Sequence, residues 1–159
     1  MLAMVALALP RRSEMAESAE GSGRPGTPSP LHRLLVVEDN RHITAMVADA
    51  LRRLGGTSAA IEVEIAADGA EALARLSRPP LPSLVLTDLY MPVMDGFTLV
   101  ERIRAEPRLA SLPVVALSAG GGEARARAVE LGVDFYLQKP VKAVELLDTV
   151  SALLQLPRR

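Results

Sequence analysis

The chain has 159 residues and a formal net charge of -1, with 18 Lys and Arg against 19 Asp and Glu. At roughly 150 residues per domain this length provides for one folded domain. The balanced charge excludes a strongly basic nucleic-acid footprint but leaves a local basic patch open. Cysteine is absent, which excludes disulfides, cysteine-ligated zinc and a thiol nucleophile, and aromatic residues make up only 3%, so the core must be aliphatic.

Residues 1–30 differ in composition from the rest of the chain. Residues 1–9 (MLAMVALAL) are apolar, but a membrane span needs about 20 such residues, and the arginines follow this run instead of preceding it as in a secretory signal. Residues 13–30 are rich in Pro, Gly, Ser and Glu, with almost nothing to bury. We predict a disordered tail over residues 1–30, with Met15 as an alternative start. A weak membrane or partner anchor in residues 1–9 is the competing interpretation.

The first predicted element is a buried strand at 34–37 (LLVV), a continuous apolar run. An amphipathic helix follows, with Asn40 as its N-cap and Gly55 as its stop. Its apolar positions recur at helical spacing and are expected to face the core: Ile43, Met46, Val47, Ala50, Leu51 and Leu54. Residues 61–65 (IEVEI) alternate between apolar and charged side chains, which predicts a second strand at the edge of a sheet.

The same alternation of strands and helices continues along the chain. Asp68 and Gly69 open a second helix, which closes before Pro79, and residues 84–86 (LVL) form a third strand. The remaining predicted elements are a helix through Phe97, Val100 and Ile103, a strand at 114–117, an Ala-rich helix from the triple glycine Gly120–Gly122 to Gly132, a strand at 135–137, and a final helix with Val144, Leu147, Val150 and Leu154 inward. Five strands alternating with five helices predict an α/β fold with a doubly wound parallel sheet.

The central strands end in polar side chains. Glu38 and Asp39 follow the first strand, Asp88 ends the third, and Ser118 and Lys139 end the fourth and fifth. Ligands of open parallel sheets bind outside the carboxyl ends of the strands, where the strand order reverses; in the order 2-1-3-4-5 this point lies between strands one and three. Three carboxylates meeting there favour Mg²⁺, which prefers hard oxygen ligands. With Mg²⁺ and a lysine nearby, a carboxylate can accept a phosphoryl group as an aspartyl phosphate.

Taken one at a time, these residues have simpler explanations. Asp39 could cap the helix that follows it, Ser118 could bond a neighbouring backbone group, and Lys139 could be solvated. The arrival of all five groups at one edge of the sheet favours a shared site. His32 and His42 are interpreted as structural or solvated, because no cluster of further ligands surrounds them in the sequence.

Four segments resemble the motifs of a known family. They are LLVVEDN at 34–40, LVLTDLYMPVMDG at 84–96, VVALSA at 114–119 and DFYLQKP at 134–140. In order and spacing the chain is similar to a two-component response-regulator receiver domain of the chemotaxis-regulator type, over nearly all of residues 33–156. The resemblance implies a flavodoxin-like fold with strand order 2-1-3-4-5, and a receiver domain over residues 31–157.

The resemblance also implies a role for each residue of the acidic pocket. Asp88 would be the phosphoacceptor. Mg²⁺ would be held by Asp39, Asp88 and the backbone carbonyl of Tyr90, with Glu38 completing the acidic pair. Glu38 stands where aspartate is commoner in the family.

Around this pocket, the resemblance implies that Ser118 and Lys139 stabilise the phosphoryl group. Ser118 and Tyr136 would form the switch, in which the Tyr136 rotamer reports the movement of Ser118. The Lys139-Pro140 peptide bond is expected to be cis.

The function implied is that of a single-domain response regulator in the cytoplasm, not an enzyme acting on other substrates. It would accept its phosphoryl group from a histidine kinase or a histidine phosphotransfer protein, as in a phosphorelay. It would signal to a downstream protein through the fourth helix, fifth strand and fifth helix. No nucleic-acid partner and no membrane span are expected, and phosphorylation-dependent homodimerisation is left open.

Two other functions stay open at this stage. The first is a receiver-like interaction module that works without phosphorylation. The second is an enzyme, and two kinds fit the sequence poorly. A phosphatase with an aspartyl-phosphate intermediate typically has a second aspartate at the position of Tyr90. A flavin-binding protein would not carry the acids Glu38 and Asp39 in its phosphate-binding loop. We further hypothesise that Tyr90 shields the phosphoryl group from water. We also expect the loop at 119–122 to be mobile before phosphorylation, because ordering its glycines costs conformational entropy.

Overall fold

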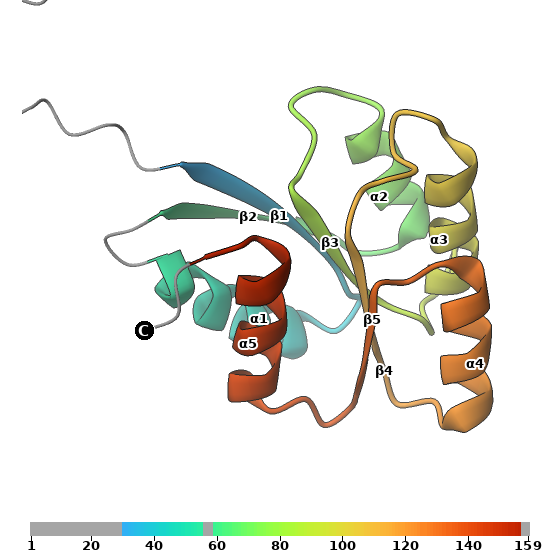
Figure 1. Ribbon diagram of the computed structural model, residues 1–159. Coiled ribbons are helices and arrows are strands. Elements are labelled where there is room, and N and C mark those ends of the chain that lie inside the picture. The colour runs from blue at the N-terminus through green and yellow to red at the C-terminus, as the bar shows by residue number, and fades with distance from the viewer. Residues whose placement is uncertain (1–29, 56–58, 157–159) are drawn as a thin grey trace, which may run out of the picture.

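The structure is a computed structural model that describes residues 30–55 and 59–156 (Figure 1). The predicted disordered tail, apart from Pro30, lies outside the described residues. Ten elements follow one another in the described part of the chain: β1 (Leu31–Val37), α1 (Arg41–Gly55), β2 (Ala60–Ala66), α2 (Gly69–Leu76), β3 (Leu84–Asp88), α3 (Gly96–Ala105), β4 (Val114–Ser118), α4 (Gly122–Leu131), β5 (Phe135–Gln138) and α5 (Ala143–Leu153).

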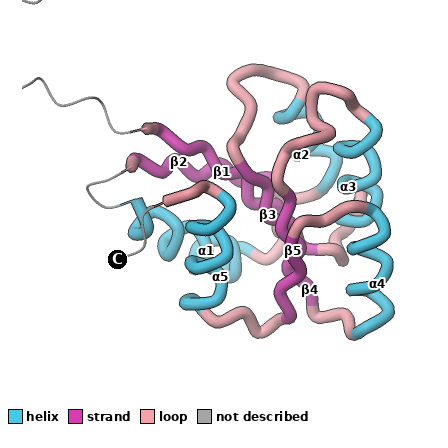
Figure 2. The backbone as a smooth tube through the Cα atoms, viewed as in Figure 1, coloured by secondary structure: helices cyan, strands magenta, loops and turns pink. Residues whose placement is uncertain are grey.

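The five strands form one parallel sheet in the order β2-β1-β3-β4-β5 (Figure 2). The predicted fold class and strand order are therefore confirmed. β2 lies at the edge, as its alternating sequence predicted, and β3 and β4 are buried at every position. Such continuous apolar strands are stable only where both faces of the sheet are covered.

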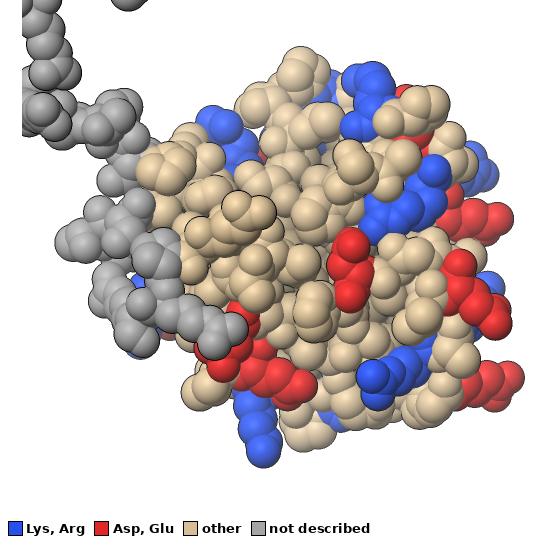
Figure 3. All heavy atoms as spheres, viewed as in Figure 1, with Lys and Arg blue, Asp and Glu red and all other residues tan. Residues whose placement is uncertain are grey.

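Helices cover the sheet on both faces (Figure 1). Alternate residues of β1 divide between two cores, because successive side chains of a strand point to opposite faces. Leu34 and Val36 pack with α1 and α5, whereas Leu35 and Val37 pack with α2 and α3. A smaller third cluster lies under α4. On the face shown in Figure 3, acidic and basic side chains are interspersed, as the balanced composition led us to expect.

Three helices begin at polar residues that satisfy free backbone N–H groups. Asn40 accepts from the N–H groups of His42 and Ile43 at the start of α1, as predicted. Asp68 and Asp95 cap α2 and α3 in the same way. The loops leaving the carboxyl ends of β1, β2 and β3 are thereby fixed at the point where the next helix starts.

Two side chains that were predicted to face the core do not. Met46 of α1 is 63% exposed, and Val144 of α5 is 71% exposed. The buried face of α5 is rotated about the helix axis relative to the predicted one, so that Leu146 and Val150 are buried. Met46 and Val144 lie outside the set of α1 and α5 residues that pack against the sheet. No helix among residues 30–55 and 59–156 is long and apolar enough to span a membrane.

Candidate functional site

The register of the sheet brings the carboxyl ends of β1 and β3 side by side. Val37 pairs with Thr87, so that Glu38 and Asp88, which follow them, leave the sheet at the same level. Asp88 in turn lies opposite Leu117, one residue before Ser118. Ser118 lies opposite Gln138, one residue before Lys139. Polar residues that are up to 101 positions apart in the chain thus converge at one edge of the sheet.

Glu38, Asp39 and Asp88 form an acidic cluster in which carboxylate oxygens from the three residues lie within 4.8 Å of one another. Glu38 and Asp88 are buried, and Asp39 is exposed to solvent. Like charges at this distance repel one another strongly where water is excluded. The cluster therefore needs positive charge in or beside it.

Lys139 supplies one positive charge to this cluster. Its Nζ lies 2.7 Å from Oε2 of Glu38 and 3.2 Å from Oδ2 of Asp88. The cis Lys139-Pro140 peptide follows β5 directly, and Lys139 itself is anchored to β4 because its N–H donates to the Ser118 carbonyl at 2.9 Å. With three carboxylates and one ammonium, the cluster still carries an excess of two negative charges.

Burial and charge act in opposite directions on the buried members of the cluster. Burial raises the pKa of Glu38 above its ordinary value of 4.5, while hydrogen bonds from Lys139 and from the N–H of Asn40 oppose that rise. Burial alone would lower the pKa of Lys139, but the hydrogen bond to Glu38 and the charge of Asp88 outweigh burial and raise it. Lys139 is therefore a firmly protonated cation at neutral pH.

The backbone around Asp88 fixes the orientation of its carboxylate. Oδ1 accepts from the N–H groups of Leu89 at 2.7 Å and Tyr90 at 3.3 Å. Oδ2 faces Lys139. The fully buried Thr87 donates its hydroxyl to the Asp88 carbonyl at 2.7 Å. Gly96 packs against the same carbonyl so closely that a Cβ there would lie only 2.0 Å from it.

Thr87 and Gly96 were not predicted as parts of the site. A threonine inside a buried strand carries no sequence signal that distinguishes it from an ordinary strand residue. The Asp-Gly pair at 95–96 indicates a turn, but only the folded chain shows that Gly96 lies against Asp88.

Ser118 and Tyr136 meet at one residue of the loop between β4 and α4. Ser118 is fully buried, and its Oγ accepts from the N–H of Gly120 at 3.1 Å. The hydroxyl of the half-buried Tyr136 donates to the carbonyl of Gly120 at 2.5 Å. The two residues of the predicted switch are therefore connected through Gly120. The mobility predicted for 119–122 stays a prediction.

Tyr90 lies beside the site with its side chain 56% exposed. Its ring packs edge-on against Phe97, with 5.7 Å between the ring centroids, and also lies against Gly120. The guanidinium of Arg127 stacks on Phe97, 4.3 Å from the ring centroid. This stack connects α4 to the segment that carries Asp88, and no pattern in the sequence predicts it.

The donor set of the acidic cluster fits a hard divalent cation. All three side chains offer carboxylate oxygen, and the described residues bring no nitrogen or sulfur ligand into the group. Mg²⁺ is typically bound by one or two carboxylates together with phosphate oxygens and water. The excess of two negative charges would be neutralised by such an ion.

Comparison with known proteins agrees with this geometry. The family model for the response regulator receiver domain matches residues 34–151. The chain belongs to this family. Receiver domains are signalling modules that interact with histidine kinases or phosphotransfer proteins, and they typically bind Mg²⁺ at an acidic pocket.

Curated relatives of this receiver domain differ widely in length. The transcriptional regulatory protein PrrA of Mycobacterium bovis is 39% identical over 131 residues, which are 82% of this chain and 52% of PrrA. The sensor histidine kinase TmoS of Ectopseudomonas mendocina is 37% identical over 140 residues, 87% of this chain and 14% of TmoS. An uncharacterized 14.6 kDa protein of Leptolyngbya boryana is 40% identical over 119 residues, 74% of this chain and 86% of that protein. The chain thus spans about half or less of the multidomain relatives.

Solved structures show the same fold. A putative response regulator from Chloroflexus aurantiacus has a TM-score of 0.72 and 34% identity, covering 80% of this chain and 99% of that one. The chemotaxis response regulator CheY4 of Vibrio cholerae has a TM-score of 0.69 and 30% identity, covering 77% of this chain and 98% of that one.

Proposed function

We propose that this receiver domain accepts a phosphoryl group on Asp88 and that its phosphorylation is the signal. The observation that carries the proposal is the ammonium group of Lys139, which contacts Glu38 and Asp88 together inside a cluster of three carboxylates. A purely structural ion pair needs one acid and one base. The surplus of buried acid is costly for folding, and the proposed phosphotransfer gives it a use.

In the proposed reaction, a carboxylate oxygen of Asp88 attacks the phosphorus of a phosphohistidine on a kinase or phosphotransfer protein. An oxygen–phosphorus bond forms and the nitrogen–phosphorus bond breaks. The histidine nitrogen keeps the electron pair of the broken bond and takes up a proton. Phosphoryl transfer depends mainly on positioning and on charge neutralisation, and the N–H groups of Leu89 and Tyr90 hold the Asp88 carboxylate in place for it.

Mg²⁺ would be held by Asp39 and Asp88 with the backbone carbonyl of Tyr90, and Glu38 would complete the acidic pocket. When bound, the ion neutralises the negative charge of the carboxylates and of the phosphoryl oxygens. Lys139 and Ser118 would contact the other phosphoryl oxygens. Lys139 is suited to this because its ammonium already lies 3.2 Å from Oδ2 of Asp88.

The phosphoryl group would change the shape of the β4–α4 loop. It adds about -1.5 to -2 charges to the pocket, which attract the Ser118 hydroxyl and Lys139. Ser118 would then release the N–H of Gly120, whose carbonyl is held by Tyr136. A change at Asp88 would thereby reach β5, and from there the surface formed by α4, β5 and α5, to which a downstream protein would bind.

Acetyl phosphate with Mg²⁺ tests the proposal without a cognate kinase. We expect intact-protein mass spectrometry to show the gain of one phosphoryl group, with changed NMR shifts at the neighbours of Asp88 and Ser118. Asp88→Asn should abolish the gain. Asp49→Asn is the matched control, because within the described part of the chain Asp49 forms an exposed ion pair with Arg53 on α1 and is no member of the acidic cluster.

If Asp88→Asn is labelled as well as the wild type, the assignment of the acceptor is wrong. If acetyl phosphate and beryllofluoride both leave the mass and the spectrum unchanged in the presence of Mg²⁺, the domain is a phosphorylation-independent interaction module. The contact of the Lys139 ammonium with Asp88 inside the acidic cluster makes this second outcome unexpected.

A further inference from the structure

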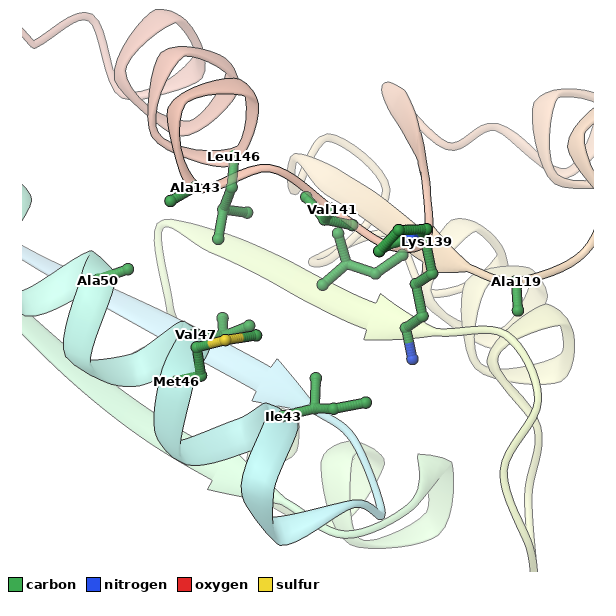
Figure 4. Close-up of a pocket in the computed structure, with 11 residues that line it drawn as sticks. Ile43, Met46, Val47, Ala50, Ala119, Lys139, Val141, Ala143 and Leu146 are labelled. Atoms are coloured by element: carbon green, nitrogen blue, oxygen red, sulfur yellow. The ribbon is translucent and has the colours of Figure 1, made fainter.

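An apolar groove lies between α1 and the segment that joins β5 to α5 (Figure 4). It has a volume of about 500 Å³. From α1 it is lined by Ile43, Met46, Val47 and Ala50, and these side chains face Val141, Ala143 and Leu146 across the groove (Figure 4). A pocket of this size and composition is typical of sites that bind apolar groups.

The groove is open although its walls are made of core-type residues. Met46, whose spacing predicted a buried position, is 63% exposed on its rim. The charged residue in the lining is Lys139, and it is already paired with Glu38 and Asp88. An apolar segment could therefore enter without removing an unpaired charge from water, which would be the main cost of burial.

The chain contains an apolar segment that the fold of residues 30–55 and 59–156 does not use. Residues 1–9 (MLAMVALAL) have no charged side chain, and five of them are Leu, Met or Val beyond the first residue. This run is too short to span a membrane. We propose that residues 1–9 bind in the groove between α1 and the β5–α5 segment of the same chain.

The connecting segment has the length that this arrangement needs. Residues 10–29 separate the apolar run from Pro30, and the disordered tail predicted from composition would have an r.m.s. end-to-end distance of about 24 Å over these residues. Pro30 precedes the start of β1, whereas the groove borders the carboxyl ends of the strands. A seven-residue strand is about 23 Å long, so the linker and the span match.

Matching lengths make even weak binding effective. A linker whose r.m.s. length equals the span gives an effective concentration on the order of 1 mM. A groove affinity of about 1 mM would then leave the groove occupied about half of the time.

Paramagnetic relaxation enhancement in the full-length protein tests the binding. The chain has no cysteine, so Ala6→Cys carries the only site for a nitroxide label. We expect the label to broaden the amide signals of Met46, Ala50 and Ala143 strongly, and those of α4 little. Met46→Asp should restore the groove signals at least several-fold, because it places a charge on the groove rim at an exposed position that the fold tolerates.

Val129→Asp is the matched control, because Val129 is a 58% exposed apolar residue on α4, away from the groove. It should leave the broadening unchanged. Equal broadening in Met46→Asp and Val129→Asp, or none at the groove, would overturn the proposal. A mixing experiment distinguishes binding within one chain from binding between chains. Protein that carries the nitroxide but no ¹⁵N is mixed with ¹⁵N-labelled protein that carries no nitroxide. Broadening that appears only between chains in this mixture would also overturn the proposal, because the occupant would then be a second copy. None of these readouts depends on phosphorylation, so the proposed function can fail or stand independently.

Discussion

The close packing of Gly96 against Asp88 leads to a sharp prediction for Gly96→Ala. Gly96 is the first residue of α3, and its N–H donates to the carbonyl of Leu89 at 3.0 Å. A Cβ added there would lie 2.0 Å from the Asp88 carbonyl oxygen and 2.8 Å from Cα of Leu89. Because both neighbours are backbone atoms, the contact can be relieved only if the β3–α3 loop and the start of α3 move apart.

Two effects of opposite sign determine the size of the change. Alanine is the better helix former by about 0.8–1.0 kcal/mol. Forcing a methyl group into a packed site typically costs about 1–3 kcal/mol, and more where the backbone must move. A contact at 2.0 Å belongs at the upper end of that range. We therefore expect a net loss of about 2 kcal/mol in the free energy of unfolding.

Urea denaturation followed by circular dichroism measures this difference, with Gly122→Ala as the control. Gly122 also begins a helix, α4, but nothing lies within 4 Å of its added Cβ. Gly122→Ala should be neutral or should stabilise the protein by up to about 1 kcal/mol. If Gly96→Ala is as stable as the wild type, the steric reasoning is refuted. Gly96→Ala should also slow labelling of Asp88 by acetyl phosphate, because its carbonyl is displaced together with its carboxylate.

Three further predictions concern charge and access at the site and at the sheet edge. Tyr90→Asn should speed loss of the phosphoryl group by up to about tenfold, or about 1.4 kcal/mol in the barrier, measured as decay of the labelled mass; an unchanged rate would show that Tyr90 does not shield it. Mg²⁺ at ten times its Kd should stabilise the wild type by about 1.4 kcal/mol in thermal melts, and Asp39→Asn should lose this gain while Asp49→Asn keeps it. The hydrogen bond from Arg75 lowers the pKa of Glu64 from 4.5, so Glu64 contributes stability above pH 4.5 that disappears as the pH falls through its lowered pKa. Glu64→Gln should therefore cost about 1 kcal/mol at pH 7 in urea titrations, and a difference that persists at pH 2 would contradict the ion-pair explanation.

The fold could be predicted because each strand carries its own signal of burial. β3 and β4 are continuous apolar runs and lie in the centre of the sheet, whereas residues 61–65 alternate and lie at the edge. The proximity of the polar residues at the strand ends then follows from the parallel topology, since all carboxyl ends of the strands meet at one edge of the sheet. That is why the sequence alone predicts that Glu38, Asp88 and Lys139 lie together.

What could not be predicted depends on contacts between segments far apart in the chain. Helical periodicity places Met46 on the apolar face of α1, but it does not show whether another element covers that position. The same holds for Gly96, whose need for glycine arises from the Asp88 carbonyl and not from its own turn. Arg127 stacks on Phe97, and Phe97 in turn contacts Tyr90, so that α4, α3 and the β3–α3 loop are joined. No local pattern in the sequence relates these three segments.

The scarcity of lysine has a practical consequence for experiments on this protein. Lys139 and Lys142 are the only lysines in the chain. Lys139 is firmly protonated and paired with two carboxylates, which makes it a poor nucleophile, whereas Lys142 is exposed three residues further on. Side-chain amine coupling to a biosensor surface would therefore attach the protein through Lys142, next to the acidic pocket, and would hide the face to be measured. Immobilisation through an introduced tag or cysteine on α3 avoids this artefact.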